Sequence, residues 1–268
     1  MDSDYVIDAV SAILREANIE YVKWDMNRQI TDMPCPGYNH KYTLGYYKVM
    51  SAITSAFPNV LFEGCSAGGG RFDAGVLAYM PQIWTSDNSD AVSRLKIQYS
   101  TSMCYPVYSI SSHITASPNH QCGRITSLKT RGDVAYMGTF GYELDITKAT
   151  DEEFEEIKQQ IEFEKQLRPL MRDGDLYRLQ NPYDENYCAW SIVSKDKKQV
   201  FLFACKVLSV AQTKNPKLKL QGLTPNKQYR DIKTGEIYGG DMLMYRGIKI
   251  DYKVQDFATE VKIFEAIN

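Results

Sequence analysis

The sequence predicts an α/β region followed by an all-β region. Up to about residue 174, short apolar segments rich in strand formers, such as Tyr21–Trp24, alternate with amphipathic segments of helical period, such as Val6–Ala17. Beyond that point, short strand-like segments follow one another with turns between them and no helices. The sequence therefore predicts two domains, 1–174 and 175–268.

The first region contains four or five strand–helix units. Its predicted strands are short apolar runs, and its predicted helices have apolar residues at helical spacing. Thr150, with acids in the turn after it, caps the longest helix. The predicted helices are 6–17, 42–57, 91–103 and 151–171, the strands are 21–25, 60–63 and 83–85, and 107–110 and 134–137 are weaker strand candidates.

The second region is predicted to be an antiparallel β-sandwich. Asp/Lys, Pro-Asn and Thr-Gly turns separate its segments, without intervening helices. The predicted strands are 189–193, 199–205, 217–220, 228–231 and 260–264.

Four or five units are too few for a closed (β/α) barrel, which has eight. An open doubly wound sheet could be built from that number. The chain, however, begins almost directly with a helix and no strand before it. This favours a partial (β/α) TIM barrel made of the C-terminal strand–helix units.

Composition excludes some classes of function. The net charge of −2 predicts neither nucleic-acid binding nor attachment to a membrane. The six cysteines contain no C-x-x-C pair, so zinc-ligand spacing is absent and free thiols in a reducing compartment are expected. No signal peptide or membrane-length apolar run is present. We therefore expect a cytoplasmic protein, unless this chain is a piece of something longer.

Two predicted strands end on carboxylates. Asp25 closes the strand 21–25, and Asp87 follows the strand 83–85. Barrel enzymes place catalytic groups at these strand ends, and two carboxylates are what a glycoside hydrolase requires. Lys23 lies two residues before Asp25 on the same strand face, which favours an ionised nucleophile. Asp87 is close to Trp84, and partial burial there would favour the protonated form that an acid catalyst needs.

A rival motif is Gly64-Cys65-Ser66-Ala67-Gly68, which matches the G-x-S-x-G nucleophile elbow of serine hydrolases. An elbow leads directly into a helix, and Gly68-Gly69-Gly70 is a poor helix start. A tight loop that allows close approach of the backbone to a ligand is the simpler interpretation.

Several long motifs together resemble the retaining α-galactosidases of glycoside hydrolase family thirty-six, the melibiases. Gly141 to Asp145, Leu176 to Leu179 and Gly222-Leu223 look similar as well, so the likeness runs along the whole chain. The most specific motifs are Tyr21-Val-Lys-Trp-Asp-Met-Asn-Arg28, Glu63-Gly-Cys-Ser-Ala-Gly-Gly-Gly-Arg71-Phe-Asp73, Trp84-Thr-Ser-Asp-Asn-Ser-Asp90 and His113-Ile-Thr-Ala-Ser-Pro-Asn-His-Gln121.

The resemblance implies roles for these residues. Asp25 would be the nucleophile and Asp87 the acid/base of a two-carboxylate double displacement on terminal α-galactosides of the melibiose and raffinose type, without a metal or organic cofactor. By the same resemblance, Ser66 would be a residue of the loop and not a nucleophile. The implied substrate-binding residues are Lys23, Trp24, Asn27, Cys65, Ser66, Gly68, Arg71 and Trp84.

The chain also departs from the family, whose members are far longer. It lacks their N-terminal β domain and first barrel strands, and with them the Asp-Asp pair and tryptophan that hold the sugar's 4- and 6-hydroxyls. An incomplete barrel exposes an inner wall and strand edges, so a homo-oligomer or a missing N-terminal portion is expected. We expect this form to be weakly active or inactive.

Three alternatives stay open: a non-enzymatic fragment or sugar-binding remnant, an α-N-acetylgalactosaminidase, and a raffinose-type transglycosylase. The roles of His113 and His120 stay open as well, because histidines satisfied in a turn are as consistent with the sequence as a cleft-lining loop.

Overall fold

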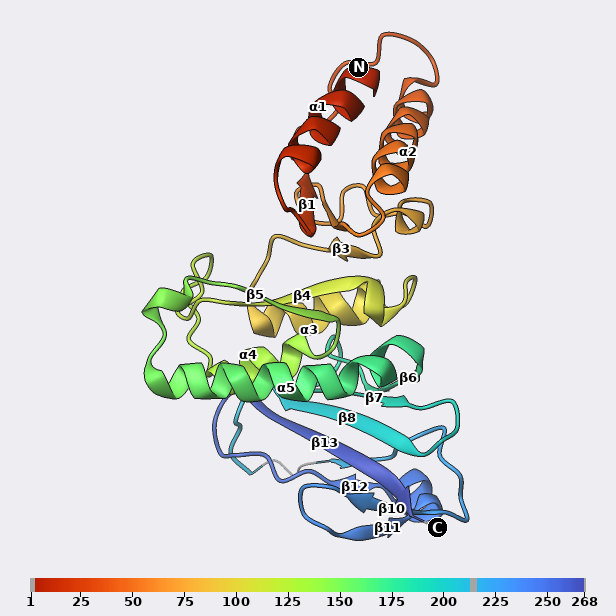
Figure 1. Ribbon diagram of the computed structural model, residues 1–268. Helices are drawn as coiled ribbons and strands as arrows, with labels where there is room; N and C mark the ends of the chain where they lie inside the picture. The colour runs from red at the N-terminus through yellow and green to blue at the C-terminus, as the bar shows by residue number, and fades with distance from the viewer. Residues whose placement is uncertain (1–2, 213–215, 268) are drawn as a thin grey trace. The chain divides into compact units, whose positions relative to one another are not determined.

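A computed structural model describes residues 3–212 and 216–267. The chain divides into two compact units (Figure 1). The first unit extends to Asp87 and includes Ser109–Ser111, and the second comprises Asn88–Tyr108 and the residues from Ser112 onward. These units divide the chain at other positions than the predicted domains, and the domain boundary at residues 174 and 175 stays a prediction.

The first unit is built on parallel strands whose carboxyl ends lie at one edge. Asp25 of the first strand lies opposite Cys65 of the second, Gly64 opposite Ile83 of the third, and Trp84 opposite Ser111 of the fourth. The strands are β1 (Tyr21–Asp25), β2 (Leu61–Cys65), β3 (Gln82–Trp84) and the start of β4 (Ile110–Thr115), and the helices are α1 (Ser3–Glu16), α2 (Tyr38–Ala56) and the 3-10 turn η1 (Val76–Ala78).

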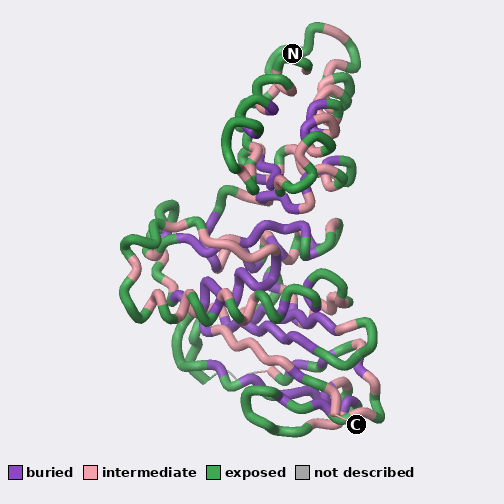
Figure 2. The backbone as a smooth tube through the Cα atoms, viewed as in Figure 1, coloured by how far each residue is buried: buried purple, intermediate pink, exposed green. Residues whose placement is uncertain are grey.

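Helices α1 and α2 lie side by side in this unit (Figure 1), and their apolar faces share a core with β2. Figure 2 shows buried stretches on α2 and the strands, whereas the outer surface of α1 is exposed. The largest fully buried side chains of this core are Met50, Ile53, Phe62 and Met80.

The helices of the second unit begin at residues with side-chain caps. Asp90 accepts a hydrogen bond from the Ser93 amide, and Thr150 forms a capping box with Glu153. Strand β5 is adjacent to β4 in the parallel sheet. The elements are α3 (Ala91–Thr101), η2 (Val107–Ser109), the rest of β4, α4 (Leu128–Ala135), β5 (Thr139–Glu143), η3 (Ile146–Lys148) and α5 (Asp151–Asp173).

The second unit ends in antiparallel sheets, one ordered β11-β10-β13-β8-β7-β6 and one made of β12 and β9. Alternation along β8 sends Phe201 and Phe203 into a core shared with α5, and Val200 and Leu202 into a core on the opposite face. The elements are β6 (Asp175–Gln180), β7 (Tyr187–Val193), β8 (Gln199–Lys206), β9 (Lys217–Leu218), β10 (Gln228–Asp231), β11 (Ile237–Gly239), the π-helix η4 (Met242–Arg246), β12 (Ile248–Lys249) and β13 (Ala258–Ile267).

The predicted fold class, a partial (β/α) barrel followed by antiparallel β-structure, is confirmed. The weak strand candidate 134–137 is wrong, because residues 134 and 135 end the short helix α4 and 136–137 form the turn after it. The candidate 107–110 overlaps a strand only at Ile110, where β4 begins, and 107–109 form a 3-10 turn before it. Met103, predicted as the last residue of the helix 91–103, lies beyond the end of α3.

Candidate active site

The carboxylate of Asp25 lies at the carboxyl end of β1 and is held by its neighbours. The Asn27 amide Nδ2 donates a hydrogen bond to Asp25 Oδ2 at 3.1 Å. The Asn27 carbonyl Oδ1 accepts one from the Ala67 backbone N–H at 2.8 Å. Asn27 therefore links the Asp25 carboxylate to the loop that follows β2.

That same loop also holds the backbone that follows Asp25. The Ser66 hydroxyl donates to the Met26 carbonyl at 2.8 Å, and Arg71 Nη1 donates to the same oxygen at 3.0 Å. The Met26 amide in turn donates to the Cys65 carbonyl at 3.3 Å. The end of β1 is thus fixed by three hydrogen bonds to a segment about forty residues further along the chain.

The glycines of the loop bring it against the segment that follows β3. Gly68 has φ +81°, and a Cβ there would lie 2.6 Å from the Ser86 Cα, so no other residue fits. The Gly69 amide donates to the Thr85 carbonyl at 3.1 Å. The loops after β1, β2 and β3 therefore pack in order along one edge of the sheet.

Lys23, Trp84 and Asp87 form a second group at this edge. Lys23 Nζ lies 5.0 Å from the centroid of the Trp84 ring, which is within the range of a cation–π interaction. The Trp84 indole Nε1 donates to Asp87 Oδ1 at 3.1 Å. Because Cys65 of the intervening strand lies between Asp25 and Trp84, the Cα atoms of Asp25 and Trp84 are about 10 Å apart, two strand spacings.

Cys65 lies between the two groups and is buried. Burial, together with a hydrogen bond to Asp25 and against the lowering effect of the Gly68 backbone, raises the pKa of the Cys65 thiol to about 11. At neutral pH the side chain is therefore a thiol and can donate to the Asp25 carboxylate.

The structure brings nine of the ten predicted site residues into this connected edge. Trp24 is different, because alternation along β1 places it on the face opposite Lys23 and Asp25. There it packs with the apolar core and lines a separate pocket of about 380 Å³ with Met26 and Tyr42.

Sequence reasoning missed a polar group beside the site. A cavity of about 570 Å³ is lined by Asn27, Tyr42, Tyr46, Arg71 and Asp73, among others. The guanidinium carbon of Arg71 lies 5.7 Å from the Tyr42 ring centroid, and burial raises the pKa of Tyr46 to about 12. The tyrosines lie four residues apart on α2, and this spacing could have indicated a shared face.

A serine-hydrolase elbow is contradicted by this geometry. The described chain after Gly70 runs through turns to the short η1 rather than into a helix. The Ser66 hydroxyl is bonded to the Met26 carbonyl, as a loop-fixing side chain would be.

The histidine-containing motif belongs to β4 and the loop after it. His113 Nδ1 lies 3.5 Å from a Glu143 carboxylate oxygen, and a Cβ at Gly141 would lie 2.8 Å from the His113 ring. Asn119 Oδ1 accepts from the amides of Gln121 and Cys122 and so shapes the loop.

Within residues 3–212 and 216–267, no group of three or more His, Cys, Asp or Glu side chains could hold a metal ion. In the same part of the chain, no helix has the length and apolar character needed to cross a membrane.

A parallel α/β half-barrel with two carboxylates at its carboxyl edge has the architecture of a (β/α)-barrel glycoside hydrolase. Comparison with known families agrees with this class. The melibiase family model matches residues 2–174, and the model of the glycosyl hydrolase family 36 C-terminal domain matches residues 187–264. The chain belongs to the melibiase family.

Its relatives are named α-galactosidases. The chain is 48% identical over 272 residues to α-galactosidase AgaA of Geobacillus stearothermophilus, which covers 98% of this chain and 37% of that protein. It is 43% identical to α-galactosidase Mel36A of Lactobacillus acidophilus, with 99% of this chain and 37% of the relative covered. The chain thus spans little more than a third of the length of these relatives.

Solved structures of α-galactosidases superpose closely on this chain. The crystal structure of AgaA from Geobacillus stearothermophilus superposes with a TM-score of 0.95 at 49% identity, covering 99% of this chain and 38% of that one. The galactosidase domain of the α-galactosidase–sucrose kinase AgaSK gives a TM-score of 0.96 at 40% identity, over 99% of this chain and 37% of that one.

Proposed function

We propose that this chain is the catalytic half of a retaining α-galactosidase, with Asp25 as the nucleophile and Asp87 as the acid/base. The observation that carries the proposal is the shared edge of β1–β3, where Asp25 ends β1 and Asp87, in the segment after β3, accepts a hydrogen bond from Trp84. The family of the chain and the names of its relatives support the substrate class.

In the proposed first step, Asp25 attacks the anomeric carbon and forms a covalent galactosyl ester while Asp87 protonates the departing oxygen. In the second step, Asp87 removes a proton from water, and the water displaces Asp25. Asn27 and the Cys65 thiol hold the Asp25 carboxylate in position, and the Lys23 ammonium lies over the Trp84 ring at the same edge of the sheet. The reaction needs no metal or organic cofactor.

We propose terminal α-galactosides of the melibiose and raffinose type as substrates. The AgaA structures include complexes with raffinose and with stachyose, and this chain shares 48% of its residues with that protein over the superposed region. The unpaired cysteines fit a reducing, cytoplasmic compartment.

We further propose that the chain by itself is weakly active or inactive. Its parallel sheet has five strands, whereas a closed barrel has eight. A pocket wall contributed by the other strands would supply contacts to the sugar that Asp25 and Asp87 cannot replace. A homo-oligomer or a separate N-terminal portion would have to supply that wall.

The experiment that tests the proposal replaces the matched segment of AgaA with this chain and assays the chimera beside the isolated chain. We expect turnover of p-nitrophenyl α-galactoside by the chimera and little or none by the chain alone. In the chimera, Asp25→Asn should lower kcat by ~10⁴-fold or more on every substrate.

Asp87→Asn separates the two roles. It should lower kcat on melibiose by ~10²–10⁴-fold but affect the first step on p-nitrophenyl α-galactoside far less, because that leaving group needs no proton. Equal losses of kcat/KM, which reports the first step, on both substrates would contradict the acid role. Robust turnover by the isolated chain would contradict the proposed dependence on a second half.

A further inference from the structure

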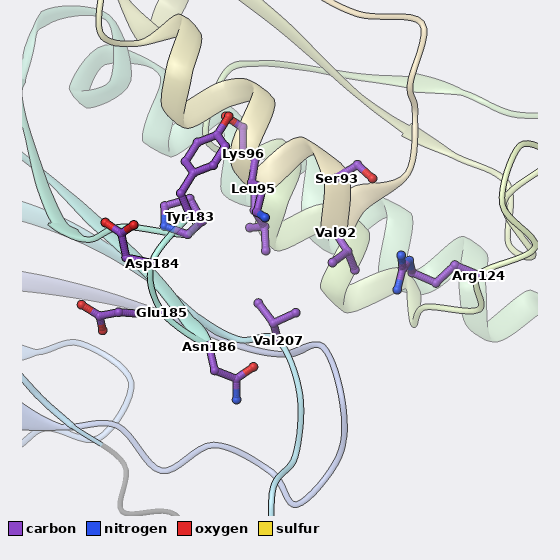
Figure 3. A pocket seen from close by; sticks show the side chains of 11 residues that line it. Val92, Ser93, Leu95, Lys96, Arg124, Tyr183, Asp184, Glu185, Asn186 and Val207 are labelled. Atoms are coloured by element: carbon purple, nitrogen blue, oxygen red, sulfur yellow. The ribbon is translucent and has the colours of Figure 1, made fainter.

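A further pocket, separate from the two described above, lies in the second unit, which holds neither Asp25 nor Asp87. Its volume is about 380 Å³, which falls within the range of small-molecule sites. Figure 3 shows it between α3 and the turn that joins β6 and β7. Its lining comprises Val92, Ser93, Leu95, Lys96, Arg124, Pro182, Tyr183, Asp184, Glu185, Asn186 and Val207.

The most distinctive side chain of this pocket is Tyr183, which is 54% exposed yet held in place. Its hydroxyl shares a 2.7 Å hydrogen bond with Ser100 Oγ, and Lys96 Nζ lies 5.2 Å from its ring centroid. An aromatic ring that is already fixed loses little conformational entropy when a ligand stacks on it.

The turn that carries Tyr183 is also ordered before any ligand binds. The Tyr183 amide donates to Asn181 Oδ1 at 3.0 Å. Asn186 donates to the Leu208 carbonyl at 2.7 Å and accepts from the Leu208 amide at 2.8 Å. The turn is therefore a preformed wall rather than a loop that must fold around its ligand.

Hydrogen-bonding groups of both kinds surround the pocket. Asp184 and Glu185 present exposed carboxylates, and Glu185 accepts only one side-chain bond, from Gln180, among the described residues. Arg124 uses its Nε on the buried Asp90, which leaves its two terminal amino groups without a protein acceptor in the described part of the chain. Figure 3 shows Arg124 across the pocket from the turn, whereas the Asp184 and Glu185 side chains extend from the turn at the rim of the pocket, where Asp184 also accepts from Asn181.

The charge of the lining selects the class of ligand. The lining contains two cations, Lys96 and Arg124, and two anions, Asp184 and Glu185, so it is neutral overall. A phosphate or another anion would require unbalanced positive charge. A neutral ring with many hydroxyl groups can use the donors and the acceptors together, while its C–H face packs on Tyr183 and on the apolar floor that includes Val92 and Val207.

We propose that this pocket is a non-catalytic saccharide-binding site, which holds a neutral hexose unit of an oligosaccharide on Tyr183. Asp184, Glu185 and Arg124 bind its hydroxyl groups. The site is independent of the proposed hydrolytic activity, because none of its residues belongs to the edge of β1–β3.

The test is a titration of the ¹⁵N-labelled chain with raffinose, followed by amide shifts in two-dimensional NMR. The chain carries Asp25→Asn, so that hydrolysis does not alter the ligand. We expect saturable shifts at the amides of the Tyr183–Asn186 turn and of the first turns of α3. Amide shifts confined to residues near Cys65, or no amide shifts up to the solubility limit of raffinose, would overturn the proposal.

Three variants and one control identify the contacts. Tyr183→Ala should weaken raffinose binding by about fivefold or more, the loss expected for an aromatic platform, and Tyr183→Phe, which keeps the ring but loses the bond to Ser100, should weaken it less. Glu185→Gln should also weaken binding, because it halves the acceptor capacity of that side chain. Tyr245→Ala, which removes an aromatic ring 70% exposed outside the pocket, is the matched control and should leave binding unchanged.

Sodium phosphate is the competing probe. If phosphate shifts the same amides at lower concentration than raffinose does, the pocket is an anion site and the saccharide proposal is wrong. If Tyr183→Ala and Tyr245→Ala weaken raffinose binding equally, stacking on Tyr183 is excluded and the proposal fails as well. Hydrolysis by the AgaA chimera is measured separately, so neither result depends on the other.

Discussion

The ion pair between Asp231 and Lys262 should contribute more to stability than any surface pair of the chain. Lys262 Nζ lies 2.5 Å from Asp231 Oδ2, and the two side chains are 12% and 0% exposed. Asp231 Oδ1 accepts from the amides of Lys233 and Thr234 at 2.9 and 3.3 Å, which fixes the turn after β10. The pair therefore joins β13 to the end of β10 inside the sheet.

Lys262→Met removes the cation and leaves a carboxylate that water does not reach. Breaking a buried pair in this way costs about 3–5 kcal/mol, because the remaining charge is uncompensated. Asp231→Asn is the matched variant. It keeps an oxygen for the turn, and the long Lys262 side chain can move its ammonium toward solvent, so we expect a smaller cost of about 1–3 kcal/mol.

The pH dependence gives a second, independent test. Burial alone would raise the pKa of Asp231, but the hydrogen bond from Lys262, the backbone donor of Lys233 and the Lys262 charge outweigh it and hold the pKa below its ordinary value of 3.8. A depressed folded-state pKa stabilises the fold above pH 3.8, and that contribution is lost as the pH falls through the lower folded-state value. In Lys262→Met, burial dominates and the pKa rises, so the variant loses less stability on acidification than its parent does.

The assay is urea unfolding followed by the fluorescence of Trp190, which is fully buried in the core on one face of this sheet. The chain has three tryptophans, so the background substitutions Trp24→Phe and Trp84→Phe leave Trp190 as the one fluorescent tryptophan. Urea unfolding is measured at pH 7 and near pH 3. The difference in the free energy of unfolding between the parent and Lys262→Met should be smaller near pH 3 than at pH 7. A difference in the free energy of unfolding below about 1 kcal/mol at pH 7, or one that does not change with pH, would refute the stabilising role of this ion pair.

Three further predictions follow from particular contacts. Three of the six cysteines should react with a thiol reagent in the native protein, and the other three should react only after denaturation, as counted by absorbance with and without guanidinium. Gly64→Ala should destabilise the first unit by about 1–3 kcal/mol in urea unfolding, because a Cβ there would lie 2.6 Å from Ile83 Cδ1 and 2.9 Å from Met80 Sδ. In the AgaA chimera, Trp84→Phe should lower kcat on melibiose about tenfold, because it removes the indole donor to Asp87; an unchanged kcat would show that this hydrogen bond does not orient the carboxylate. The thiols expected to react in the native state are Cys35, Cys104 and Cys122.

The parts of the fold that the sequence predicted correctly are those whose signal is local. Asp25 could be placed at a strand end because the strand and the helix before it each have a clear period. The helix α5 was predicted because its cap and acidic first turn lie beside its apolar face. In α4, by contrast, most of the eight residues are buried, so no polar face distinguishes helix from strand and the region around Val134 was assigned wrongly.

The same distinction applies to the candidate site. The residue types could be found from sequence, but what their side chains contact could not, since those contacts join segments far apart in the chain. Asn27 reaches Ala67, and Ser66 and Arg71 both reach the Met26 carbonyl, across forty or more positions. Trp24 was assigned to the site although alternation from Asp25 already placed it on the other face of β1.

These long-range contacts determine which part of the proposed chemistry depends on an intact barrel. Asn27 and Cys65 hold Asp25, Trp84 holds Asp87, and the close approach of Gly68 to Ser86 fixes the loops between them, all within β1–β3 and their loops. The orientation of both carboxylates is therefore set by consecutive strands and does not require the strands that would close the barrel. On the proposed mechanism, the strands that would close the barrel would add contact with the sugar, which supplies binding energy and excludes water. Restoring a second half should thus lower KM and raise kcat without changing how Asp25 is held, so the amide shifts of Asn27 and Ala67 should be the same in the isolated chain and in the chimera.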